Sequence, residues 1–130
     1  MAIEYIRRTP TTNQEYFNKQ LEQAVNEIVN RVNINYKKVT TSTYDILVDN
    51  LFIDVNVGTA TTLSLPQNPP IGTNFIVKDS SGSAGTNNIT VTPASGNTIQ
   101  GQANFVINNN FGSLEIIYNG TNQWLVIQNQ

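Results

Sequence analysis

Two hydrophobic periodicities divide this chain into a helical segment and a longer strand-rich segment. Between residues 13 and 34, apolar side chains recur at steps of three and four, which gathers them on one face of an α-helix. From Tyr36 onward the period becomes two and turn residues punctuate the chain, as in an all-β unit. We therefore predict residues 1–12 as an extended arm, residues 13–35 as an amphipathic helix and residues 36–130 as a β-domain.

The predicted helix has a start signal and an uninterrupted interior. Thr12 or Asn13 provides an N-cap, and Glu15 lies in the first turn, where the helix dipole favours an acidic side chain. No Gly or Pro interrupts the segment. Its apolar stripe consists of Phe17, Leu21, Val25, Ile28 and Val32.

The spacing of this stripe is compatible with two different packing partners. Leu21, Val25, Ile28 and Val32 follow one another at steps of four, three and four, which is the a/d seam of a short oligomeric coiled coil. A sustained seam normally extends over about three or four heptads, so a helix docked on its own β-domain fits the periodicity nearly as well. The helix pattern alone leaves both alternatives open.

The strand-rich segment predicts a compact antiparallel β-sandwich or barrel-like domain. In Val39–Val48, the residues Tyr44, Ile46 and Val48 share one face, and in Leu51–Val57 the odd-numbered residues do so. The Ser-, Gly- and Asn-rich stretch Ser80–Asn88 is predicted to be a mobile loop. Further strands are predicted at Thr61–Leu65, Asn74–Asp79, Asn88–Pro93, Phe105–Asn108, Ser113–Tyr118 and Trp124–Ile127.

The last two predicted strands are apolar on both faces and are joined by Asn119-Gly120, a hairpin signal. One face belongs in the domain core, but a β-domain of this size has little material to cover the other. A neighbouring subunit supplies the simplest cover. A parallel homotrimer, with three helices in a short coil and three β-domains packed or intertwined, would explain both the helix seam and this hairpin.

Charge is sparse and unevenly distributed along the chain. Charged residues make up 12% of the sequence, against about 25% in ordinary soluble proteins, whereas 51 of the 130 residues are Asn, Gln, Ser or Thr. Six of the seven cations lie in residues 1–38, and Glu115 is the only charged residue after Asp79. This break in composition supports two structural modules.

The residue inventory argues against catalysis. Without Cys or His there is no thiol nucleophile, Cys/His zinc site or Ser-His relay. Asp45, Asp49 and Asp54 are candidates for a carboxylate pair, but Asp49 has the better explanation of forming a turn. No run of acids suits calcium, and the loop after Asp79 lacks the lysine of a phosphate cradle. We expect a non-enzymatic protein without metal or cofactor.

The charge balance and hydropathy limit the expected partners and location. A net charge of −2 provides no general attraction to nucleic acid. No stretch approaches the ~20 apolar residues of a membrane-spanning helix, and the first residues lack the apolar core of a signal peptide. We expect a protein made in the cytoplasm, without membrane insertion.

Two further segments are candidates for binding. The first is the arm, in which Ile3, Tyr5 and Ile6 would add a strand to a partner's sheet while Arg7 and Arg8 pair with its carboxylates. A solvated terminus is the alternative there.

The second candidate surrounds the last hairpin turn. Tyr118 and Trp124 would provide a sugar-stacking platform, with Asn119 and Asn122 as hydrogen-bonding glycan contacts. Core packing of Trp124 is the stronger alternative. The exposed polar run Asn108–Asn110 is another candidate loop.

Residues 59–127 carry a series of ordered markers. These are Leu65-Pro66, the strand and turn NITVTPASGNTIQG ending at Gly101, a following apolar strand, a Gly-Ser strand and the terminal YNGTNQWLVI ending at Ile127. In this order they resemble a β-module at the C-terminal end of tailed-bacteriophage head-fibre, capsid-decoration and tail-fibre proteins. The similarity covers a little over half of the chain.

The resemblance implies a trimeric module carried on the virion. It also implies that the arm and helix attach the protein to a capsid, collar or tail protein. The chain has no long shaft, which favours a compact capsid decoration or short head fibre over a long tail fibre. A glycan-recognising tip or adaptor of a tail fibre, which would bind a host surface glycan, is the alternative.

Overall fold

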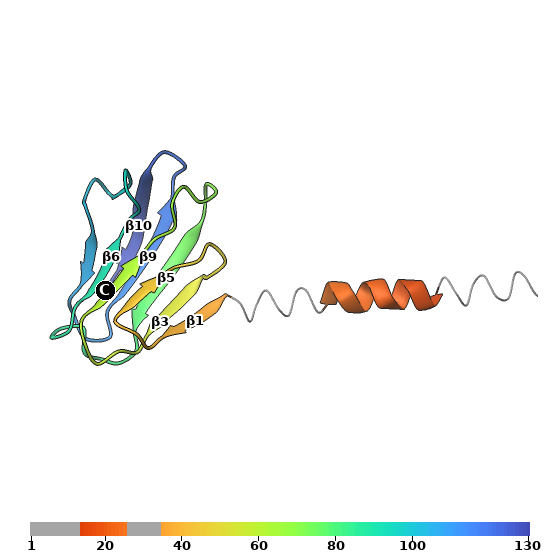
Figure 1. Cartoon of the computed structure of the whole chain (residues 1–130), viewed down its shortest axis with the longest axis horizontal. Helices are drawn as coiled ribbons and strands as arrows, with labels where there is room; N and C mark the ends of the chain where they lie inside the picture. Colours follow the sequence, from red (N-terminus) through yellow and green to blue (C-terminus); the bar gives the residue numbers. More distant parts are fainter. Residues whose placement is uncertain (1–13, 26–34) are drawn as a thin grey trace, which may run out of the picture. The chain divides into compact units, whose positions relative to one another are not determined.

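The computed structural model describes residues 14–25 and 35–130, and the chain divides into two units at residues 34 and 35. In the first unit, residues 14–25 form an α-helix, within the segment predicted to be helical (Figure 1). No helix among the described residues is long and apolar enough to cross a membrane. The second unit, Asn35–Gln130, is the β-domain.

The helix presents the apolar stripe that the sequence predicted. Phe17, Leu21 and Val25 are each more than half exposed to solvent. They are spaced by four residues, so they follow one another along one side of the helix. The other two members of the stripe, Ile28 and Val32, lie outside the described residues.

The β-domain contains two sheets (Figure 1). The six-stranded sheet has the order β1-β3-β5-β9-β10-β7, and the four-stranded sheet has the order β2-β4-β6-β8. The strands are β1 (Tyr36–Val39), β2 (Thr43–Asp45), β3 (Phe52–Val55), β4 (Thr61–Ser64), β5 (Asn74–Asp79), β6 (Ile89–Thr92), β7 (Thr98–Ile99), β8 (Phe105–Ile107), β9 (Ser113–Tyr118) and β10 (Gln123–Asn129).

The prediction of an antiparallel domain is wrong for most strand pairs. From β1 to β8, odd-numbered strands lie in the six-stranded sheet and even-numbered strands in the four-stranded sheet. From β1 to β6, the chain forms one strand in one sheet and the next strand in the other sheet, in turn. As a result β1, β3 and β5 pair in parallel in the six-stranded sheet, and β2, β4 and β6 pair in parallel in the four-stranded sheet. The domain begins as a coil of stacked strands, and antiparallel pairing enters only with β8, β9 and β10.

The predicted terminal hairpin is confirmed. Strands β9 and β10 pair antiparallel, with Trp124 opposite Tyr118. Gly120 and Asn122 both adopt positive φ in the turn, a conformation that glycine and asparagine accept most readily.

The prediction of one strand over Val39–Val48 is wrong. The chain forms two strands, β1 and β2, separated by residues 40–42. Tyr44 is half-buried and Ile46 is buried, but Val48 lies beyond the end of β2 and is exposed. Once the strand ends, the alternation of faces no longer holds.

The core lies between the two sheets. Its buried apolar residues alternate along the strands, as in β5 and β9, where every second side chain is inaccessible to solvent. At its centre the ring of Trp124 packs against Phe75 at 5.5 Å and against Tyr118 at 5.1 Å between centroids. Burial of aromatic rings in such numbers contributes strongly to the stability of a domain this small.

The outward faces of the two sheets differ in chemistry. On the four-stranded sheet, Thr43, Thr62 and Thr90 lie side by side in register, and Asp45, Ser64 and Thr92 form the next row. On the six-stranded sheet one row contains Tyr36, Phe52 and Ile76 and continues to Glu115 on β9. The next row contains Lys38, Asp54 and Lys78, and at the other end of the sheet Ile117 pairs with Leu125. One outer face is therefore rich in hydroxyl side chains, and the other combines apolar with charged side chains.

Candidate functional site

The loops of the β-domain gather at its two ends. The Asn35 end contains Asn35, where the chain enters the domain, and the turn that leads into β3, whose Leu51 and Phe52 donate backbone hydrogen bonds to the Asn35 carbonyl. The Asp79 end contains the loops after β5 and β8, which meet where the backbone N–H of Asp79 donates to the carbonyl of Gly112. These two ends are the main candidates for function.

Asp79 organises the loops at its end through five accepted hydrogen bonds. Its Oδ1 accepts from the backbone N–H and the hydroxyl of Ser81, at 3.1 and 2.7 Å, and from the N–H of Gly82 at 3.1 Å. Its Oδ2 accepts from the N–H groups of Ala84 and Phe111, both at 3.0 Å. One buried carboxylate thereby joins the loop after β5 to the loop before β9.

The environment of Asp79 explains its ionisation. Burial by itself raises the pKa of this carboxyl, but the hydrogen bonds from Ser81, Ala84, Phe111 and Gly82 favour the charged form and lower the pKa below its ordinary value of 3.8. The same bonds hold Ser81, Gly82 and Ala84 in the segment Ser80–Asn88, which the sequence predicted to be mobile. In this part of the loop the backbone and one serine hydroxyl supply the donors that a buried carboxylate requires, which counts against mobility there.

The acidic residues considered for catalysis, Asp45, Asp49 and Asp54, lie on β2, on the connection between β2 and β3, and on β3. Asp54 lies on the outer face of the six-stranded sheet and accepts hydrogen bonds from the hydroxyls of Tyr36 and Ser80. The bond to Asp54 is the main cause of a raised pKa at Tyr36. Asp45 lies on the other sheet, and the described residues contain no cluster of acids able to hold a metal ion.

The predicted sugar-stacking platform at the last hairpin is wrong. Trp124 is completely buried and Tyr118 nearly so, so neither ring offers a face to a ligand. Asn119 uses its side-chain oxygen within the turn, accepting from the N–H of Thr121 at 2.8 Å. Asn122 is exposed, but the aromatic partners proposed for it belong to the core.

A shallow groove of about 230 Å³ lies at the Asp79 end of the domain, away from the last hairpin turn. Its walls come from β8 and from the end of β10. Four amide side chains line it, and none of them has a hydrogen bond to another side chain or to the backbone within residues 14–25 and 35–130. The groove is lined by Phe105, Val106, Ile107, Asn108, Asn109, Asn129 and Gln130.

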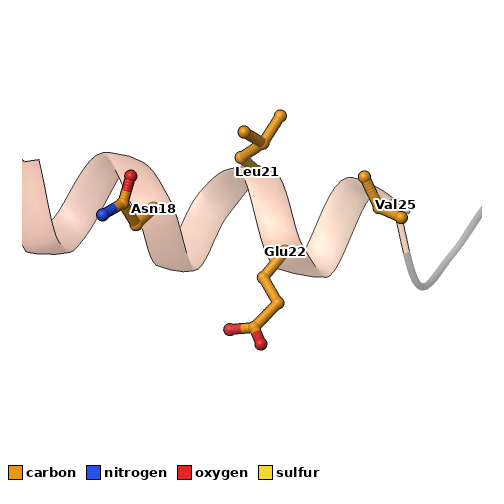
Figure 2. A pocket seen from close by; sticks show the side chains of 4 residues that line it. All are labelled: Asn18, Leu21, Glu22 and Val25. Carbon is orange, nitrogen blue, oxygen red and sulfur yellow. The ribbon is translucent and has the colours of Figure 1, made fainter.

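A second candidate surface lies on the helix of residues 14–25 and is formed by that helix alone. Figure 2 shows Leu21 and Val25 projecting from one side of the helix and Glu22 from the other, with Asn18 a turn away. A single helix cannot enclose a small ligand. An exposed apolar stripe of this kind is suited to packing against another helix.

The remaining predicted site residues are not described. The anchoring residues Ile3, Tyr5, Ile6, Arg7 and Arg8 lie outside the described part of the chain, as do Ile28 and Val32. Comparison with known proteins identifies no matching family and no significantly similar curated protein.

Proposed function

We propose that this chain is a homotrimeric structural protein of a tailed-bacteriophage virion, serving as a capsid decoration or short head fibre anchored by its N-terminus. The helix would form a short coil and the β-domain would project outward. The exposed apolar stripe of the helix is the observation that carries the proposal, because a stripe of this spacing is stable in water only when it is covered.

The outer face of the six-stranded sheet supports self-association. Ile76 and Ile117 are only partly covered there, and Leu125 is exposed. Lys78 and Glu115 lie on the same face. Exposed apolar side chains grouped on one surface are a common feature of association sites. A neighbouring copy of the β-domain would remove these side chains from water.

The attachment to a capsid, collar or tail protein is proposed from the sequence of the arm and from the resemblance to phage appendages. Its apolar residues and arginine pair suit strand addition to an acidic partner. The described residues contain no group of acids able to hold a metal ion.

The oligomeric state and the location test the proposal separately. Multi-angle light scattering of the full chain should give three times the 14.4 kDa of one chain at micromolar concentration. Antibody labelling of intact particles should place the protein on the virion, and deletion of residues 1–12 should prevent incorporation without changing the oligomer. A monomer, or normal incorporation of the deletion, would contradict the corresponding part of the proposal.

A glycan-recognising role is the second candidate, and the groove beside β8 favours it. Amide side chains both donate and accept hydrogen bonds, as paired sugar hydroxyls require, and Phe105 adds an apolar wall. No charged side chain lines the groove, so a neutral saccharide suits it better than an acidic one.

A glycan array with variants at both ends of the domain tests this role. Binding to neutral oligosaccharides should be lost in Asn109→Ala and Asn129→Ala. Gln67→Ala removes an exposed amide from a loop outside the groove and should leave binding unchanged. A blank array, or equal loss in Gln67→Ala, would reject the groove as a glycan site.

A further inference from the structure

An exposed apolar patch lies at the Asn35 end of the β-domain. It consists of Tyr36, Leu47, Val48 and Leu51, whose side chains are between 38% and 57% exposed. Tyr36 begins β1, and the other three belong to the connection from β2 to β3. The backbone N–H of Leu51 donates to the carbonyl of Asn35 at 3.0 Å, which joins the two parts of the patch.

Internal hydrogen bonds hold this patch open to solvent. The side-chain oxygen of the buried Asn50 accepts from the Tyr44 hydroxyl at 2.8 Å and from the Leu47 N–H at 2.9 Å. The Asn50 N–H in turn donates to the Leu47 carbonyl at 3.0 Å. Because Asn50 fixes the turn, Leu47 and Val48 cannot fold back into the core.

We propose that the patch of Tyr36, Leu47, Val48 and Leu51 is the surface through which the β-domain contacts the β-domain of a second copy of this chain. This inference rests on the proposed trimer and specifies where its β-domains meet. The patch continues onto the six-stranded sheet, since Tyr36 stacks on Phe52 with 5.8 Å between ring centroids.

The connectivity of the chain favours a second copy as the partner. The patch adjoins Asn35, and the helix of residues 14–25 precedes it by nine residues that can span roughly 30 Å at most. Helices joined in a parallel coil therefore tether the Asn35 ends of their β-domains close together. Such a tether gives effective concentrations of about a millimolar, enough for a small patch to associate.

Charge around the patch also suits contact between copies. Lys37 lies over the Tyr44 ring at 5.2 Å. Burial raises the pKa of Tyr44, and the negative charges of Asp49 and Asp45 raise it further, which places both acids near the same ring. A rim that carries both signs can face another copy of itself without uniform repulsion.

The absence of cysteine from the sequence allows a direct test by disulfide cross-linking. Single substitutions Leu47→Cys and Val48→Cys are made in the full chain and oxidised under mild conditions. Non-reducing electrophoresis should show covalent pairs of chains. Val106→Cys is the matched control, because Val106 is also exposed but lies on β8, in the other sheet.

Light scattering of each reduced variant separates the outcomes. Trimers that cross-link through residues 47 and 48 but not through residue 106 support the patch. Trimers that fail to cross-link at residues 47 and 48, or that cross-link equally at residue 106, overturn the proposed patch contact. The proposal of a trimer would then still hold. A reduced protein of monomeric mass contradicts both the trimer and the contact that depends on it.

Discussion

At the Asp79 end of the β-domain, a buried carboxylate binds two loops together through five hydrogen bonds. At the Asn35 end, the buried side-chain amide of Asn50 also fixes a loop. In that loop, however, Leu47 and Val48 are exposed to solvent. Both ends use a buried polar side chain as an internal anchor. The difference lies in what each anchored loop presents to solvent.

This difference indicates how the two ends are used. The Asp79 end presents mainly Ser, Asn and Thr side chains, which remain soluble without any partner, with the exposed ring of Phe111 as the apolar exception. The Asn35 end presents rigid apolar side chains, whose cost in water is recovered only by contact with another surface. A domain that self-associates near its point of attachment and faces solvent at its other end would show this arrangement.

Removal of the Asp79 carboxylate should have the largest effect. Asp79→Ala leaves the N–H groups of Gly82, Ala84 and Phe111 without their acceptor, and should lower the free energy of unfolding by about 3 kcal/mol, or Tm by roughly 12 °C. Denaturation at fixed protein concentration measures the change. Asp49→Ala, an exposed acid at the Asn35 end, is the control and should change stability little. Equal effects of the two substitutions would remove the contrast between the ends.

A methyl group at Gly112 should have the next largest effect. A Cβ there would lie 2.5 Å from the side-chain oxygen of Asn109 and 2.7 Å from both the Gln130 carbonyl oxygen and a methyl of Ile107. Gly112→Ala should therefore cost about 2 kcal/mol of stability. Gly58→Ala is the matched control, because nothing lies within 4 Å of its added Cβ. Similar unfolding curves for the two variants would show that the Asp79 end is not tightly packed.

Acid should weaken the Asp79 end selectively. The folded pKa of Asp79 lies below its unfolded value, so the charged carboxylate contributes stability above about pH 4 that is lost as the pH falls through the folded pKa. The loss should be smaller than in Asp79→Ala, since a protonated carboxyl still accepts hydrogen bonds. Hydrogen exchange of the Gly82, Ala84 and Phe111 amides measures it. A fall in protection at the Asn35 end before these amides would contradict the assignment.

The strand pattern could be predicted from the sequence wherever alternation persisted over a full strand. In β5 and β9 every second residue is buried, as the period of two requires. The pairing direction could not be predicted, because alternation identifies the face of a side chain and not its neighbouring strand. β7, with two residues, is too short to produce a period.

The candidate sites show the same limit. Trp124 was a candidate ligand platform because the sequence places it beside a polar turn, but its indole faces the core from β10. The role of Asp79 depends on donors as distant as Phe111, a contact across 32 residues that no local pattern reveals. Exposure of Val48 went unpredicted because the alternation was extended past the end of β2.

Val48→Ser should have the smallest effect on the stability of the β-domain itself. It therefore separates a contribution of Val48 to the fold from a contribution to the contact between copies. Because Val48 is exposed, its replacement should change the free energy of unfolding of the dissociated chain by no more than roughly 0.5 kcal/mol. If Val48 is buried between copies, the same change should raise the concentration at which the trimer dissociates by about tenfold. Sedimentation across a dilution series measures this shift, with Val106→Ser as the control. A loss of domain stability without a change in dissociation would assign Val48 to the fold instead of the interface.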